Sequence, residues 1–269
     1  MHLNADRGIV GRRAVLRRRE VVAFALLFLV YQLPEGVGQR WFRSFTLQAA
    51  LLLAFFPVAY LVGRWLRSTA ARAYALESSV AVLRSSAILF VAVCVMKVIA
   101  MGIGGALGVY AVTAEGPVSR SLLLGLPTSL LITVFPSVAE DIGTRGFWFR
   151  LERASWTPVS FVVASSAIYV ANHIYRLGQG PAEWTMLFAF GCAYAAAVAR
   201  FGSLWPAVAL HWGWNFANEW LGSALAVSIR SPNGSRLLSG AAHVVLLAVV
   251  MAWPGVVPGR RTNESTLVQ

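Results

Sequence analysis

Charged side chains are scarce in this sequence, and lysine is almost absent. Only 13% of the 269 residues are charged, whereas a soluble domain carries about 25%. Hydrophobic residues make up 58% of the chain, and the mean hydropathy is +0.65. This balance excludes an ordinary soluble domain. It predicts an all-α, polytopic membrane protein built as one helical bundle.

Cysteine is also scarce, and familiar signatures of covalent or metal chemistry are missing. Cys94 and Cys192 lie in apolar runs without a CxxC spacing, so we interpret them as packing residues. Neither a GxSxG nor an HExxH motif occurs, which removes the usual serine-hydrolase and zinc-protease signatures. The glycine-rich segment Gly102–Gly108 lacks the strand–turn–helix context of a dinucleotide site, and close helix packing explains it better.

Eight apolar runs approach or exceed the length of about 20 residues that a membrane-spanning helix needs. They cover 21–36, 46–66, 86–112, 121–140, 157–175, 184–199, 203–222 and 238–255. We therefore expect about eight transmembrane helices. Residues 127–153 are predicted to form one long helix that turns near Ser155 into an antiparallel helix over 156–175.

The first run follows six arginines and superficially resembles a signal peptide. Tyr31, Gln32, Pro34 and Glu35 stand where a cleavage site needs small residues, so this segment is expected to remain as the first transmembrane helix. Abundant arginine, alanine and valine suggest a high-GC bacterial genome. The expected location is the bacterial plasma membrane.

Composition divides the chain into five segments. We expect a basic cytoplasmic segment over 1–20, transmembrane helices over 21–119, a motif-bearing core over 120–222, a C-terminal helix within 223–258 and a polar tail over 259–269. Eight spans place sixteen arginines on the side of the termini and six on the other, so both termini are predicted to be cytoplasmic. The net charge of +12 is attributed to topology and anionic lipids, and nucleic acid is not an expected partner.

Three polar motifs lie in or beside the apolar runs. They read Glu140-Asp141-x-x-x-Arg145-Gly146, Tyr169-x-x-x-His173 and His211-x-x-x-Asn215. An ionisable group at membrane depth costs about 2.5–3.5 kcal/mol on insertion scales, so such groups persist mainly where they pair or act. Counting the helical rise from each turn puts the carboxylate, both imidazoles and the amide at similar depth. The motifs therefore predict one site.

Two kinds of hydrolytic site fit these side chains. A buried glutamate can activate water, a histidine can orient that water, and an asparagine with a second histidine can stabilise an oxyanion. Alternatively, Glu140, His173 and His211 form a two-histidine, one-glutamate zinc set with an open position. Asp141 and Arg145 are one helical turn apart and are expected to form a supporting ion pair.

Three further residues receive structural interpretations. Gly146 is expected to allow close helix approach. Lys97, in the third run, is expected to pair with a carboxylate or to extend its ammonium group toward the interface, and a functional role is the alternative. His243, in the last run, has no motif around it and is interpreted as a hydrogen-bonded packing residue.

Together the motifs resemble those of the CPBP family, the CaaX prenyl-protease and bacteriocin-processing intramembrane endopeptidases, also called the Abi family. That pattern is Glu-Glu-x-x-x-Arg, Phe-x-x-x-His and His-x-x-x-Asn/Asp. Here Asp141 replaces the second glutamate and Tyr169 replaces phenylalanine. The run from Gly202 to His211 is also typical of the family, and the resemblance covers about residues 120–222.

The resemblance implies roles for the motif residues. Glu140 would activate the attacking water and His173 would position it. His211 and Asn215 would line the oxyanion site, or His211 would help to bind a metal. Both a zinc-dependent and a metal-free, glutamate-dependent route have been argued for the family. Tyr169 would keep the shape of phenylalanine and add a hydroxyl able to donate into the site.

The implied activity is endoproteolysis within the membrane. The expected substrate is a hydrophobic or lipidated peptide, CaaX-like or bacteriocin- or leader-like, that enters laterally from among the membrane lipids. The alternatives are a non-catalytic immunity or scaffold protein and a proton-coupled transporter that uses the Glu and His groups as a relay. Transporters usually contain internal repeats with broken helices, which are not evident in this sequence.

Overall fold

Helices dominate the computed structural model, which describes residues 17–67, 69–114, 118–151 and 156–254. The elements in chain order are α1 (Arg18–Leu33), η1 (Pro34–Trp41), α2 (Phe45–Leu66), α3 (Ala70–Ala73), α4 (Val80–Ala106), β1 (Tyr110–Ala114), α5 (Val118–Asp141), η2 (Ile142–Gly146), α6 (Phe147–Phe149), α7 (Pro158–Asn172), η3 (Leu177–Gln179), α8 (Pro181–Phe201), α9 (Trp205–Gly222), β2 (Leu225–Ile229) and α10 (Pro232–Ala252). The predicted turn near Ser155, the polar tail and most of the basic segment 1–20 lie outside the described residues.

Six helical segments of the described chain are long and apolar enough to cross a membrane. They are Arg18–Trp41, Phe45–Leu66, Val80–Ala106, Arg120–Phe149, Pro181–Phe201 and Pro232–Ala252. Each of the eight predicted runs coincides with a helix, so the polytopic helical bundle is confirmed, while the number eight is approximate. The helices of the other two predicted runs, α7 and α9, are not among these six. Helix α7 has only 15 residues, and α9 carries polar side chains along its 18 residues.

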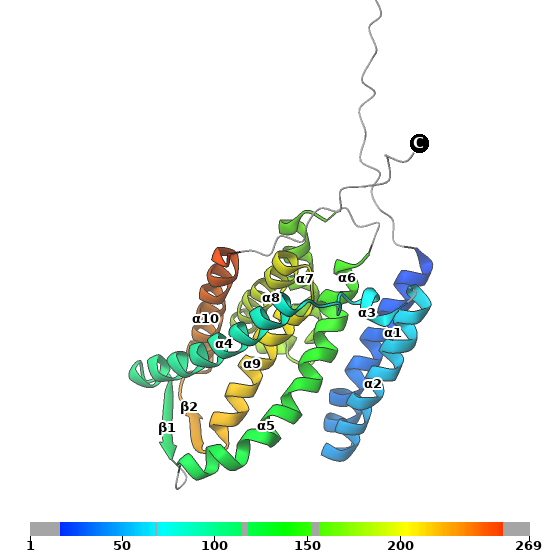
Figure 1. The fold of residues 1–269 in the computed structure, drawn as a ribbon. Coiled ribbons are helices and arrows are strands. Elements are labelled where there is room, and N and C mark those ends of the chain that lie inside the picture. Colours follow the sequence, from blue (N-terminus) through cyan, green and yellow to red (C-terminus); the bar gives the residue numbers. More distant parts are fainter. Residues whose placement is uncertain (1–16, 68, 115–117, 152–155, 255–269) are drawn as a thin grey trace, which may run out of the picture.

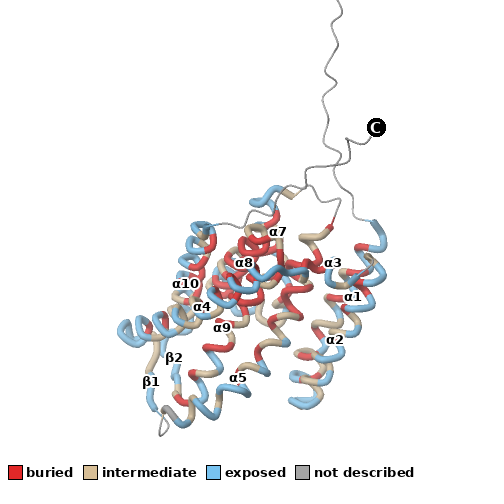
Figure 2. The backbone as a smooth tube through the Cα atoms, viewed as in Figure 1, coloured by how far each residue is buried: buried red, intermediate tan, exposed pale blue. Residues whose placement is uncertain are grey.

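The central helix of the bundle is α8, which packs against α7, α9 and α10 (Figure 1). In its most apolar membrane-length window 61% of the residues are buried, compared with 17–28% in the other five candidate spans. Figure 2 shows the buried positions gathered around α7, α8 and α9, with exposed positions along the outer helices. Apolar residues such as Leu29, Leu61 and Met251 are about 60% exposed on those outer faces, as expected for surfaces that contact lipid.

A short antiparallel strand pair joins the chain after α4 to the chain after α9. Tyr110 pairs with Ile229, and Ala114 pairs with Leu225. The helix predicted to continue to residue 112 ends at Ala106, and Gly108 follows with φ +69° in the left-handed region that glycine favours. The pair lies at the end of the bundle opposite the start of α1 (Figure 1).

The helix that carries the first motif runs from Val118 to Phe149, so it ends four residues before the predicted end at 153, and it contains a π turn. The amide of Phe147 donates to the carbonyl of Ile142, five residues earlier. Such turns often occur at functional sites. A Cβ on Gly146 would lie 2.6 Å from the carbonyl oxygen of Tyr74, which confirms that this glycine permits a close approach. The π turn therefore fixes the segment directly after Glu140 and Asp141 against the α3–α4 connection.

Candidate active site

Glu140 lies between two histidines. One carboxylate oxygen, Oε1, is 3.4 Å from Nε2 of His173, and the other, Oε2, is 3.6 Å from Nε2 of His211. These side chains come from α5, from the C-terminal end of α7 and from α9, respectively. Glu140 is 6% exposed and His211 is 4% exposed. Three residues from three separate motifs therefore meet, and the depths counted from the helix lengths agree with this contact.

Hydrogen-bond acceptors fix the orientation of both imidazoles. Nδ1 of His173 is 2.8 Å from the carbonyl oxygen of Tyr169, and Nδ1 of His211 is 3.2 Å from Oδ1 of Asp141. Because a carbonyl and an ionised carboxylate only accept, each Nδ1 is assigned a hydrogen, and Nε2 of each ring faces Glu140. The carboxylate and the two Nε2 atoms form a group of acceptors that can hold a water molecule by its hydrogens.

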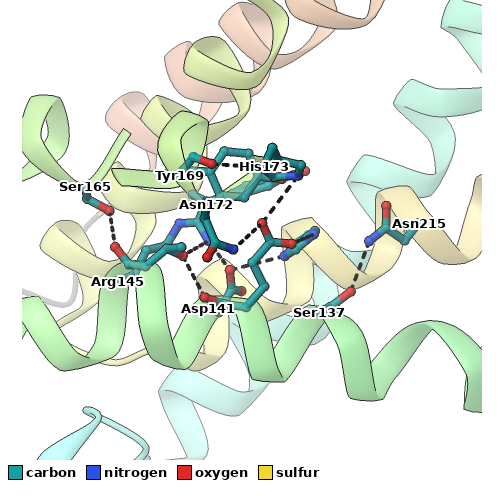
Figure 3. A network of polar contacts seen from close by, with 12 residues as sticks. Ser137, Asp141, Arg145, Ser165, Tyr169, Asn172, His173 and Asn215 are labelled. Carbon is teal, nitrogen blue, oxygen red and sulfur yellow. Dashed lines mark hydrogen bonds and ion pairs between the residues drawn. The ribbon is translucent and has the colours of Figure 1, made fainter. Parts of the chain in front are cut away.

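A fully buried ion pair supports this centre. Asp141 and Arg145 pair one helical turn apart, as their spacing predicted, and both side chains are 0% exposed. The Arg145 guanidinium lies 4.4 Å from the ring centre of Tyr169 and 4.9 Å from that of Tyr194. Figure 3 shows Asp141 and Arg145 close to Tyr169 and Asn172. The two aromatic faces attract the cation where water is excluded. These contacts are those of a residue that supports the fold of the site.

Tyr169 contributes its ring and its backbone carbonyl to the site. The ring covers Arg145, and its edge contacts His173 with the ring centroids 4.7 Å apart. Its hydroxyl makes no hydrogen bond within the described part of the chain, so the expected donation into the site is not found. The physical reason is the position of the ring, which is 2% exposed and packed between Arg145, His173 and the neighbouring Tyr194.

Asn215 lies one helical turn after His211 but contacts a different group. Its Nδ2 donates to Oγ of Ser137 at 3.2 Å, and Figure 3 shows this pair apart from Asp141 and Arg145. The structure therefore does not bring Asn215 into contact with Glu140. The amide carries a second N–H, and Asn215 lines the same cavity as Glu140, His173 and His211.

This cavity has a volume of about 610 Å³ and lies beside Glu140. Its walls come from α4, α8, α9 and α10 and from the strand pair, in addition to the motif residues. Met186, Phe190 and Trp214 give it apolar surface, and Arg176 gives it positive charge. A substrate with an extended apolar segment would find both room and matching surface next to the carboxylate.

Lys97 also lines the cavity, and the predicted pairing with a carboxylate is not found there in the described part of the chain. Its ammonium group lies 4.7 Å from the ring centre of Trp214 and pairs with no carboxylate of the described residues. An aromatic face therefore takes the place of the expected acidic partner.

Sequence reasoning missed two amide side chains beside Glu140. Nδ2 of Asn172 is 3.5 Å from Oε1 of Glu140. Gln32 of α1 orients this amide, since its Nε2 donates to Oδ1 and to the backbone carbonyl of Asn172 at 3.1 and 2.9 Å. The available signal was weak, namely an amide directly before His173 and another near the end of the first apolar run.

The predicted zinc ligands can be compared with this geometry. Among the described residues, no three histidine, cysteine, aspartate or glutamate side chains are arranged to hold a metal ion. Because the described side chains as placed form no such group, we derive no step through a metal.

Comparison with known proteins agrees with the motifs. Residues 121–217 match the family model described as Type II CAAX prenyl endopeptidase Rce1-like. All three motifs fall inside the match, and the resemblance to the CPBP intramembrane proteases is confirmed over this segment. Together with the six apolar helices, it supports an integral, multi-pass membrane protein of the CAAX-type intramembrane protease class. No significant match to a curated protein or to a solved structure was found.

Proposed function

We propose that this protein is an intramembrane endopeptidase that hydrolyses a peptide bond of a hydrophobic or lipidated substrate, CaaX-like or bacteriocin- or leader-like. The observation that carries the proposal is the carboxylate of Glu140, placed between Nε2 of His173 and Nε2 of His211 in the wall of a 610 Å³ cavity. A base, orienting imidazoles and space for a substrate are the requirements of water-dependent hydrolysis.

Glu140 acts as the general base in this mechanism. It takes one proton from the water while Nε2 of His173 accepts the other hydrogen and orients the oxygen. The water oxygen attacks the peptide carbonyl carbon, and the carbonyl oxygen becomes negatively charged. The proton held by Glu140 then passes to the leaving nitrogen, which breaks the C–N bond and restores the carboxylate.

The oxyanion is assigned to the side of the cavity that α9 forms. Asn215 can donate its second amide hydrogen to the developing charge. His211 can donate from Nε2 only when the ring is doubly protonated, because Nδ1 already carries the hydrogen directed at Asp141. The Asp141 carboxylate would stabilise that imidazolium. Neutral His211 would instead help Glu140 to hold the water.

The surroundings of the site favour a membrane substrate. Glu140 is nearly buried, and the helices around it expose apolar faces, so a hydrophobic peptide can approach from the lipid phase. We assign the termini to the cytoplasm and the protein to the bacterial plasma membrane, on the arginine asymmetry and composition. Membrane lipids are then the immediate surroundings of the bundle.

The first test compares the wild type with Glu140→Gln in detergent, using mass spectrometry to detect cleavage of a hydrophobic peptide library. Glu140→Gln keeps the size of the side chain but removes the base, and we expect a loss of about 10³-fold or more in kcat. Glu219→Gln is the matched control, because Glu219 is exposed on α9. If Glu140→Gln cleaves peptides as fast as the wild type, the mechanism is wrong.

Chelator treatment of the wild type and two further assays of Glu140→Gln distinguish the alternatives. Cleavage that a chelator abolishes and zinc restores would support the metal site formed by Glu140, His173 and His211. A non-catalytic immunity protein would keep its protective effect in Glu140→Gln, since no bond is broken. A proton-coupled transporter would lose coupled uptake in the same variant without ever producing a cleaved peptide.

A further inference from the structure

Five arginines line a cavity of about 250 Å³ that shares no residue with the cavity beside Glu140. Arg17 and Arg19 come from the start of α1, Arg67 and Arg72 from the end of α2 and from α3, and Arg150 from the end of α6. We call this site the arginine pocket. The elements that carry these arginines meet at the end of the bundle where α1 begins, opposite the strand pair (Figure 1).

Positive charge in the arginine pocket exceeds the negative charge that the described residues place against it. Glu20 is the acidic residue in its wall, and its carboxylate accepts from the backbone amide of Arg17 at 2.8 Å. Glu77 accepts from both Arg72 and Arg150, at 3.2 and 3.4 Å. Leaving Arg67 aside, two carboxylates thus face the four guanidinium groups of Arg17, Arg19, Arg72 and Arg150 in the described part of the chain, so an anion would be attracted to the pocket.

Arg150 lies in the wall of the pocket with 35% of its side chain exposed, and its guanidinium keeps one donor that no described residue uses. Its Nε is buried and has no hydrogen-bond partner among the described residues, although a buried donor normally has one. Guanidinium groups present planar pairs of N–H donors that match phosphate oxygens. The volume of about 250 Å³ suits a phosphate group with a small substituent and is too small for a folded partner.

The surface next to the pocket is apolar. Val21 and Leu29 of α1 are 50% and 61% exposed, and Leu61 of α2 is 65% exposed. Trp65, 52% exposed, stands near the end of α2, which is the position that tryptophan favours at a membrane interface. A cationic pocket above two apolar helix faces matches a molecule with an anionic head and hydrocarbon chains.

We propose that the arginine pocket binds the phosphodiester headgroup of an anionic glycerophospholipid, whose acyl chains lie along the exposed faces of α1 and α2. The lipid is bound through its phosphate, so free phosphate has the same chemistry and must be distinguished by experiment. This site is independent of the proposed peptidase activity, because none of its residues lines the cavity beside Glu140.

The test is native mass spectrometry of the full-length protein in detergent. The probes are phosphatidylglycerol, phosphatidylcholine with the same acyl chains, and inorganic phosphate. The pocket variant is Arg17→Gln with Arg19→Gln, because both side chains are exposed and their loss should not disturb folding. Arg72→Gln with Arg150→Gln is a second pocket variant. The control, Arg64→Gln with Arg84→Gln, removes two exposed arginines outside the pocket.

We expect the wild type to retain phosphatidylglycerol in preference to phosphatidylcholine. Each pocket variant should bind phosphatidylglycerol about 30-fold more weakly, from roughly fivefold for each basic group near an anionic lipid. The control should bind as the wild type does. Equal binding of the two lipids, or equal losses in pocket and control variants, would overturn the proposal. Displacement of the lipid by millimolar phosphate would assign the pocket to free phosphate and also overturn it.

Discussion

The ring of Tyr194 stacks on the imidazole of His211, with the centroids 5.1 Å apart and the planes inclined by 21°. The tyrosine hydroxyl shares a 2.8 Å hydrogen bond with Nε2 of His243, whose Nδ1 is 2.9 Å from the carbonyl oxygen of Ser239. Tyr194 and His243 are both fully buried. Residues of α8 and α10 thereby position an imidazole of α9, and His243 has the hydrogen-bonded packing role inferred from its sequence context.

Substitutions at Tyr194 should separate the hydrogen bond from the stack. Tyr194→Phe leaves Nε2 of His243 without its donor, so we expect a loss of about 1–3 kcal/mol in stability and little change in kcat. Tyr194→Leu also removes the ring that contacts His211 and Arg145, and kcat should fall about tenfold or more. Thermal unfolding in detergent and peptide cleavage measure the two effects. Tyr60→Phe, at a position 55% exposed, is the control, and equal destabilisation by both Phe variants would contradict this prediction.

The buried pair of Asp141 and Arg145 should make Asp141 more important for folding than for chemistry. Asp141→Asn leaves the Arg145 guanidinium without its counter-charge at a position that is 0% exposed, which should cost about 3–5 kcal/mol. Asp141→Glu, which gives the Glu-Glu pair typical of the family, should retain activity. Size-exclusion chromatography and thermal unfolding check the first expectation, and kcat checks the second. A stable but inactive Asp141→Asn protein would instead show that Asp141 acts mainly through His211.

The local part of the site could be predicted from the sequence. The pairing of Asp141 with Arg145 follows from their spacing of one helical turn, because helix geometry fixes which side chains share a face. The contact of Glu140 with His173 followed from counting residues back and forward from the turn between two antiparallel helices. In both cases the relevant distance depends on one or two regular elements.

The remainder of the site depends on contacts between helices that no periodicity encodes. Asn172 approaches Glu140 because α7 ends at Asn172. Gln32 of α1, which is 140 residues away in sequence, donates to Asn172. Tyr194 contacts His211 because α8 is central in the bundle. The strand pair was missed for a similar reason, since each strand is five residues long and seven helical elements separate the two strands in the sequence.

Asn172 should influence the reactivity of Glu140. Its amide is 3.5 Å from Oε1 of Glu140, and removing this donor would change the orientation of the base. We expect Asn172→Ala to lower kcat about tenfold with a smaller effect on KM. Asn218→Ala is the matched control, because Asn218 lines the same cavity without contacting Glu140. The measurement is steady-state cleavage of one peptide by both variants, and equal losses of kcat would show that Asn172 has no special role.

Gly143 and Gly146 provide a matched pair three residues apart in the π turn. A Cβ on Gly146 would lie 2.6 Å from the carbonyl oxygen of Tyr74, whereas nothing lies within 4 Å of a Cβ on Gly143. Gly146→Ala should therefore cost about 1–3 kcal/mol in stability, and Gly143→Ala should be neutral or stabilising by up to about 1 kcal/mol. Thermal unfolding of the two variants measures the difference.

Gly146→Ala should also lower the activity more than Gly143→Ala does, because the π turn connects Glu140 to the surface that packs on Tyr74. In Gly146→Ala the backbone must shift to relieve the contact, and the shift displaces Arg145 and its partner Asp141, which orients His211. We expect kcat of Gly146→Ala to fall even at temperatures where the variant is fully folded, while Gly143→Ala keeps wild-type kcat. If both variants cleave peptide normally, the close approach at Gly146 serves folding alone and does not position the catalytic side chains.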